Sequence, residues 1–154
     1  MKNEINGNMA LENLNFLTLD DLSAQIIDQF LIERSGEDTQ TILETIESQQ
    51  IEVIKTKLQG RYDSDAVFNA SGTERHWLIF KILSNLVVYY FIRRNAARKV
   101  PTDYREEWEW AMKQLEKINA GRITPDGLPV ITDTDGNPAP PIMHGNNSNR
   151  DFYL

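Results

Sequence analysis

Residues 77–92 read WLIFKILSNLVVYYFI, and this run is the most apolar in the chain. In a helix it would carry apolar side chains on every face, which is typical of a helix that other helices enclose. The run is interrupted by Lys81, Ser84 and Asn85, and it is shorter than the roughly 20 residues that cross a membrane. We therefore expect a buried helix at the axis of the domain, and no membrane partner.

The residues on either side of this run predict where the helix begins and ends. Ser71 and Glu74 have the spacing of a capping box, which predicts a start at that point. Pro101 prevents the helix from continuing at the other end. Before that proline, four basic residues complement the negative pole of a helix: Arg93, Arg94, Arg98 and Lys99.

Two helices are predicted before the central one. The first begins at Thr18, whose hydroxyl can cap it while Asp21 complements the positive pole of the helix, and it ends near Gly36. The second runs from about residue 38 to residue 58, with a stripe that includes Val53 and is broken only at residues 49–50. The apolar face of the first helix contains Leu19, Leu22, Ile26, Ile27 and Phe30.

One helix is predicted after the central one. It extends from about Thr102 to Ala120, and Gly121 ends it. A connection that starts at residue 61 joins the second helix to the third. We expect it to be a polar loop of about ten residues. The apolar face of the last helix contains Tyr104, Trp108, Ala111, Leu115 and Ile118.

These patterns predict an all-α fold, a four-helix bundle around a buried central helix, with non-helical arms at both ends. Residues 1–15 form an N-terminal arm, residues 16–121 the helical domain and residues 122–154 an extended C-terminal arm. Turn-forming residues dominate the last segment. Residues 128–132 can form a short strand or a β-hairpin before the turn at Asp135 and Gly136.

The composition limits the classes of partner and site. The chain has no cysteine, which excludes disulfides and Cys-ligated metals. Its net charge of -7 argues against binding nucleic acid over a wide surface. The charge is uneven, because residues 1–70 carry 13 acids and 5 bases whereas residues 71–121 carry 6 acids and 9 bases. Regions of opposite charge steer subunits together, so we expect a protein that assembles with copies of itself.

No pattern typical of an enzyme or a cofactor site is present. The histidines, His76 and His144, have no further ligand at metal-binding spacing. Residues 133–136 read DTDG but lack the later glycine and glutamate of a calcium loop. A Gly-rich phosphate loop and a nucleophile elbow are also missing. We expect no catalytic residue, metal or cofactor, and only a buried carboxylate with a strongly raised pKa would favour an enzyme.

Three groups of residues are candidate contact sites. Trp110 lies two positions after Trp108 and points about 200° away from the buried stripe, which predicts an exposed tryptophan of the kind found in interface anchors. The basic residues Arg93, Arg94, Arg98 and Lys99 favour the helix-pole role or a protein contact over nucleic acid. The chain ends in side chains that can enter a partner's pocket: Phe152, Tyr153 and Leu154.

In order along the chain, four segments are similar to the small helical connector proteins of tailed bacteriophages, including the Mu-like prophage family. Residues 16–22 (FLTLDDL) resemble the opening of their first helix, and residues 57–62 (KLQGRY) resemble the end of their second. Residues 89–94 and 100–123 resemble parts of their third and last helices. Two features depart from the family, which often has prolines where this chain has residues 63–64 and often ends sooner after the last helix.

The resemblance implies a head–tail connector, also called a head-completion or adaptor protein, that is part of the virion and assembles in the host cytoplasm. Its implied partners are further copies in a ring of about twelve, the portal protein, and tail or further ring proteins. DNA would pass through the central channel without sequence-specific binding. The alternative function is a helical DNA-binding regulatory protein, although no predicted helix has a continuous basic face.

Overall fold

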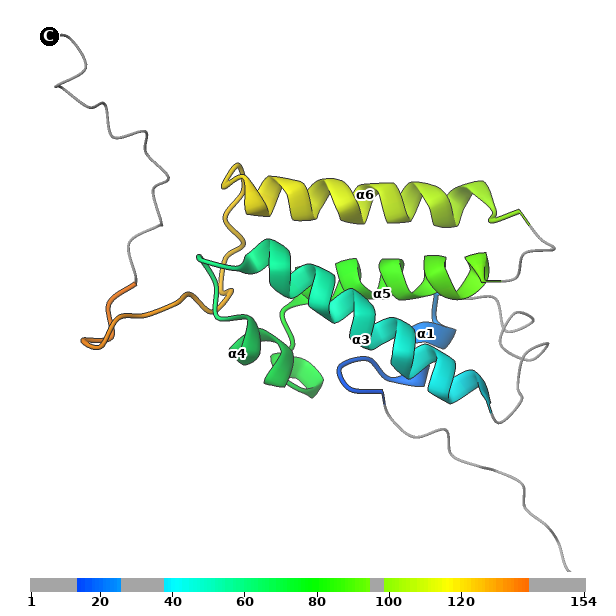
Figure 1. The fold of residues 1–154 in the computed structure, drawn as a ribbon, viewed down its shortest axis with the longest axis horizontal. Helices are drawn as coiled ribbons and strands as arrows, with labels where there is room; N and C mark the ends of the chain where they lie inside the picture. Colours follow the sequence, from blue (N-terminus) through cyan, green and yellow to red (C-terminus); the bar gives the residue numbers. More distant parts are fainter. Residues whose placement is uncertain (1–13, 26–37, 95–98, 139–154) are drawn as a thin grey trace, which may run out of the picture.

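The computed structural model describes residues 14–25, 38–94 and 99–138, and over these ranges the chain is mainly helical (Figure 1). This confirms the predicted all-α class, and the described residues contain no strand. None of the helices in these ranges combines the length and the apolarity of a membrane span. The elements are α1 (Leu19–Ser23), α3 (Asp38–Leu58), α4 (Ser64–Asn69), the 3-10 turn η1 (Gly72–Glu74), α5 (Trp77–Arg93) and α6 (Thr102–Asn119).

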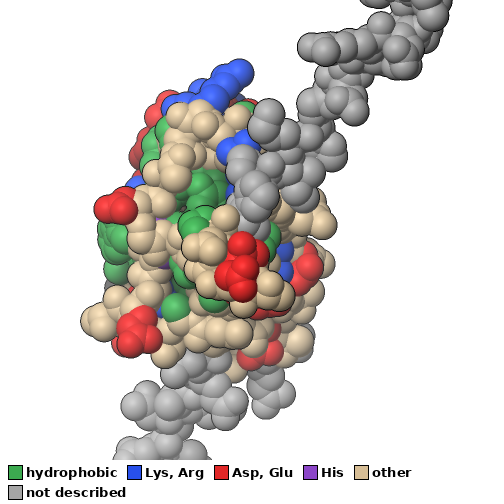
Figure 2. Space-filling model, turned by 90° about the vertical axis from the view of Figure 1, so that its left-hand side faces the viewer, with side chains coloured by type: hydrophobic (Ala, Val, Ile, Leu, Met, Phe, Trp, Pro, Cys, Tyr) green, Lys and Arg blue, Asp and Glu red, His purple; other side chains and the backbone are tan. Residues whose placement is uncertain are grey.

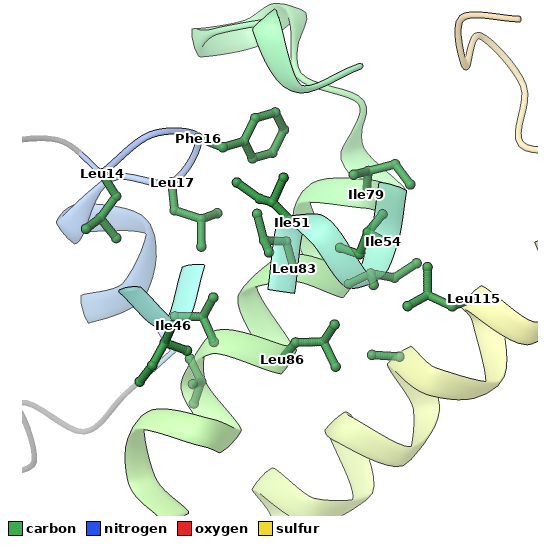
Figure 3. Close-up of a cluster of buried hydrophobic side chains, with 14 of the residues drawn as sticks. Leu14, Phe16, Leu17, Ile46, Ile51, Ile54, Ile79, Leu83, Leu86 and Leu115 are labelled. Carbon is green, nitrogen blue, oxygen red and sulfur yellow. The ribbon is translucent and has the colours of Figure 1, made fainter. Parts of the chain in front are cut away.

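Helix α5 lies at the centre of the described body, as its apolar sequence predicts. It packs most extensively against α6 and α3, and it also contacts α1. Leu83 and Leu86 of α5 are fully buried in a cluster that includes Ile54 of α3 and Leu115 of α6 (Figure 3). Because burial of one such side chain stabilises a fold by roughly 1.5–3 kcal/mol, these interfaces are the main source of stability.

The start of α5 differs from the prediction. Ser71 makes no side-chain capping hydrogen bond, and it precedes η1 rather than the long helix. Helix α5 begins six residues later, at Trp77, with His76 at its N-cap. Between the two, Arg75 has extended backbone (φ -63°, ψ 132°), and its guanidinium donates to the Phe16 carbonyl at 2.9 Å. The predicted capping box is therefore wrong, because tertiary contacts of Arg75 interrupt the helix.

The connection between α3 and α5 also contains a helix that the sequence analysis missed. The Asp63 side chain accepts a hydrogen bond from the Ala66 N–H at 3.0 Å and caps α4. Val67 is buried, and the Phe68 ring packs edge-on against Phe16 with 5.2 Å between centroids. Only two apolar side chains hold this short helix, so no periodic pattern could predict it.

Helix α3 has the predicted bounds, but its buried face differs from the predicted stripe. Val53 is 38% exposed, because it lies about 100° around the helix from its buried neighbour Ile54. Glu47 and Gln50, by contrast, are buried. The buried apolar side chains of α3 are Leu43, Ile46, Ile51, Ile54 and Leu58.

The segment before α1 packs on the body. Leu14, at the described end of the predicted N-terminal arm, is buried together with Phe16 and Leu17. The predicted cap is confirmed: the Asp21 N–H donates to Thr18 Oγ1 at 3.2 Å, and the Thr18 N–H donates to Asp21 Oδ2 at 2.8 Å. The predicted continuation of this helix through residues 26–36 lies outside the described residues.

Helix α6 ends near the predicted glycine. Gly121 has a φ of +68°, in the left-handed region that favours glycine. The Gly121 N–H donates to the Ile118 carbonyl at 3.0 Å, and the Arg122 N–H donates to the Lys117 carbonyl at 2.8 Å. These hydrogen bonds satisfy the last carbonyl groups of the helix and turn the chain back toward the body.

Residues 122–138 follow the body before the chain leaves the described ranges. Leu128 is 5% exposed and belongs to the core. The Asp63 N–H donates to the Pro129 carbonyl at 2.9 Å, and the Ile131 N–H donates to the Arg61 carbonyl at 3.3 Å. In residues 122–138 the β-pairing consists of two isolated bridges, one between Val130 and Tyr62 and one between Thr132 and Pro138. The segment expected to be an extended arm therefore begins as part of the helical body.

Candidate interaction surface

One end of the body exposes apolar side chains. The ends of α3 and α6, the start of α5 and residues 122–138 lie at this end (Figure 1). Trp77 is 71% exposed, and Val130 and Ile131 are exposed as well. We call these three residues the loop-end surface. Figure 2 shows this end of the molecule, where hydrophobic side chains reach the surface between carboxylates.

Local contacts hold Trp77 in place. Its indole stacks on the Phe80 ring, with 5.4 Å between centroids and 26° between planes, and the Arg75 guanidinium lies 4.7 Å from the centroid of Phe80. The adjacent His76 donates from Nε2 to the Asp126 carbonyl at 2.8 Å. The apolar run of residues 77–92 predicted a buried Trp77, and this prediction is wrong. At the first turn of α5 most of the indole is exposed, whereas the later turns contain the buried residues of the helix.

Trp110 was expected to be exposed, and it is not. The side chain is partly buried and packs against the core cluster, with Lys81 Nζ 5.8 Å from the ring centroid. Its neighbour Trp108 is also partly buried and stacks on Tyr89 at 4.9 Å. Trp110 forms one wall of a groove between α5 and α6. That Trp110 contacts a partner remains a prediction, and such a contact would lie at this groove.

The basic residues at the end of α5 are exposed. Arg93 and Arg94 form no ion pair within the described ranges, and Lys99 is exposed where the chain resumes after residue 98. Arg94 also borders a hollow of about 310 Å³ beside residues 41–49 of α3. The other candidate residues lie outside the described residues: Arg98, Phe152, Tyr153 and Leu154.

A buried carboxylate, which the sequence analysis missed, anchors the N-terminal segment. Glu47 is fully buried, and its two oxygens accept hydrogen bonds from the backbone N–H groups of Asn15 at 2.8 Å, Phe16 at 3.0 Å and Leu17 at 2.7 Å. The signal was present, because Glu47 lies one turn after Leu43 on the apolar stripe. These contacts assign Glu47 a role in folding.

A second polar contact joins α1 to Arg75, which lies between η1 and α5. Arg75 and Asp21 form an ion pair with 2.8 Å between Nη1 and Oδ2, and both side chains are mostly buried. Burial alone would raise the pKa of Asp21. The hydrogen bonds from Arg75 and Thr18, together with the charge of Arg75, outweigh burial and lower this pKa below its ordinary value of 3.8.

Within residues 14–25, 38–94 and 99–138, no three histidine, aspartate or glutamate side chains are grouped as a metal would require. His144 lies outside these ranges.

Comparison of the chain with protein-family models, with curated proteins and with solved structures gave no match. Residues 16–22 contain the cap of α1, and residues 57–62 contain the end of α3.

Proposed function

We propose that this chain is a structural subunit of a head–tail connector in a tailed bacteriophage. In this proposal about twelve copies form a ring that docks on the portal and joins the capsid to the tail. DNA passes through the centre of the ring without sequence-specific contacts, and the subunit performs no catalysis. The subunit belongs to the virion and assembles in the host cytoplasm.

The observation that carries the proposal is the exposure of Trp77. Tryptophan is among the residues that contribute most to protein interfaces. A side chain that is 71% exposed contributes little to the fold, yet the indole stacks on Phe80, whose ring also contacts the Arg75 guanidinium. A rigid, exposed indole loses little conformational entropy on binding, which suits an assembly contact.

The distribution of charge supports self-association. A ring needs two different complementary surfaces on each subunit, because its interfaces are head-to-tail. Arg93 and Arg94 provide a basic surface at the end of α5. The exposed carboxylates Asp103, Glu106 and Glu107 provide an acidic surface along α6.

We further propose the finer fold that the resemblance implies. The body is a four-helix bundle around α5, to which α1, α3 and α6 contribute. The C-terminal arm contains a β-hairpin at Asp135 and Gly136. The isolated bridge between Thr132 and Pro138, and the hydrogen bond of 2.8 Å from the Asp133 N–H to the Asn137 carbonyl, support the turn of this hairpin.

Native mass spectrometry of the full chain, alone and with the portal protein of the same virus, tests the proposed function. We expect a closed ring of about twelve copies, or a monomer that forms this ring on the portal. Electron microscopy of the same sample should show a ring with a central channel. A chain that stays monomeric at all concentrations and does not bind the portal contradicts the proposal.

A further inference from the structure

The groove between α5 and α6 has the chemistry of a binding site. It has a volume of about 410 Å³ and lies along the partly buried face of Trp110. Both helices contribute side chains, so the walls of the groove are fixed by the most extensive helix contact in the body. The residues that line it are Lys81, Asn85, Asp103, Glu106, Glu107 and Trp110.

Asn85 leaves an unpaired acceptor at this groove. The residue is 2% exposed, and its Nδ2 donates a hydrogen bond to the Glu107 carbonyl at 3.4 Å. Its Oδ1 is buried and accepts no hydrogen bond from the described residues. A buried acceptor without a donor typically costs about 1–3 kcal/mol, so a small movement of Asn85 that exposed this oxygen to a donor in the groove would be favourable.

The charges around the groove favour a cation. Asp103, Glu106 and Glu107 are exposed, and none forms an ion pair within the described ranges. The single base of the groove, Lys81, lies toward the Trp110 ring. Three carboxylates and one ammonium group leave the groove with a net negative charge.

A guanidinium group fits these features better than an ammonium ion. It is planar and stacks on an indole such as Trp110. Its five N–H donors can bind two carboxylates of the groove at the same time, whereas a lysine side chain presents a single point charge.

We propose that this groove binds an arginine side chain, Arg93 or Arg94, of a second copy of this chain. Both arginines are exposed at the end of α5 and have no acidic partner within the described ranges. Each copy thus carries both halves of the contact, the acidic groove and the basic helix end. The inference rests on the proposed self-assembly and specifies the residues that form the interface.

Two charge-reversed forms of the full chain test the pairing. One form carries Glu106→Arg and Glu107→Arg, and the other carries Arg93→Glu and Arg94→Glu. Each form alone should associate at least about tenfold more weakly than the unaltered chain, because like charges meet at the interface. In an equal mixture each groove meets an oppositely charged helix end, and association should recover.

Sedimentation velocity measures association, and circular dichroism verifies that each form is folded. The matched control is Glu109→Gln with Glu116→Gln, which removes two exposed carboxylates of α6 that do not line the groove. This control should associate like the unaltered chain. Equal association of both charge-reversed forms and the unaltered chain overturns the groove contact but leaves self-assembly intact. An unaltered chain that never associates overturns both.

Discussion

The Glu47 carboxylate lies 2.7 Å from the backbone nitrogen of Leu17, from which it accepts a hydrogen bond across 30 residues of sequence. The same carboxylate binds the N–H groups of Asn15 and Phe16. One side chain of α3 therefore satisfies three consecutive peptide N–H groups that lie outside the helices. Leu14, Phe16 and Leu17 are buried beside this contact.

We expect Glu47→Ala to lower the free energy of unfolding by roughly 3 kcal/mol, because buried N–H donors lose their acceptor. Glu47→Gln, which retains one carbonyl oxygen, should cost less. Urea unfolding followed by circular dichroism measures both. Glu52→Ala, an exposed position on the same helix, is the control and should change stability by less than about 0.5 kcal/mol. A loss for Glu47→Ala no larger than that of the control would show that the carboxylate does not anchor the segment.

The Asp21–Arg75 ion pair predicts a pH dependence. Because the pKa of Asp21 is lowered on folding, its stabilising effect is fully present above the unfolded value of 3.8 and is lost as the pH falls through the folded pKa. Between about pH 5 and pH 2.5, Asp21→Asn should therefore lose less stability than the unaltered chain. Arg75→Leu should also lose less stability over this pH range, since it removes the ion-pair partner of Asp21. Parallel curves for all three proteins would contradict the assignment.

Much of the helical body could be predicted from local sequence. The bounds of α3, the stop at Gly121 and the Thr18 cap follow from periodicity and capping chemistry, which act within a few residues. The features that were missed depend on contacts distant in sequence. Arg75 ends the turn at η1 because it binds Phe16 and Asp21, and no pattern near residue 75 encodes this.

The candidate surface was harder to predict, because helical phase alone does not give the exposure of a side chain. The phase of α6 placed Trp110 on an outer face, but α5 approaches closely enough to cover part of its ring. Trp77 begins an apolar helix, so its surroundings in sequence predicted burial. Its exposure follows from where α5 starts relative to its neighbours, a relationship set by the tertiary fold.

Gly121 provides a test of backbone conformation at the end of α6. Gly121→Ala should destabilise the chain by about 1–2 kcal/mol because of its positive φ. The added Cβ would also meet the Arg61 guanidinium, but this group is the exposed end of a flexible side chain and can move aside. Gly127→Ala is a matched control, since it also has a positive φ but no atom near the added Cβ. Thermal unfolding should therefore show similar losses for the two variants. A clearly larger loss for Gly121→Ala would show that Arg61 does not move aside.

Trp77 and Trp108 should separate assembly from stability. Trp77→Ala should reduce ring formation at least about tenfold, with less than about 1 kcal/mol lost in stability, because the indole is exposed. Trp108→Ala should lower stability by about 3 kcal/mol, since it removes a ring stacked on Tyr89. Native mass spectrometry and urea unfolding measure the two effects. Unchanged ring formation by Trp77→Ala would exclude Trp77 from the contact.

Two truncations divide the C-terminal segment according to its role. A chain that ends at residue 121 loses the buried Leu128 and the hydrogen bond from Asp63 to Pro129, so it should lose roughly 2 kcal/mol or more of stability. A chain that ends at residue 138 keeps these contacts and should unfold like the full chain. If Phe152, Tyr153 and Leu154 contact a neighbour, the chain that ends at residue 138 should nevertheless fail to assemble. Normal assembly by this chain, measured by native mass spectrometry, would show that specificity lies within the body.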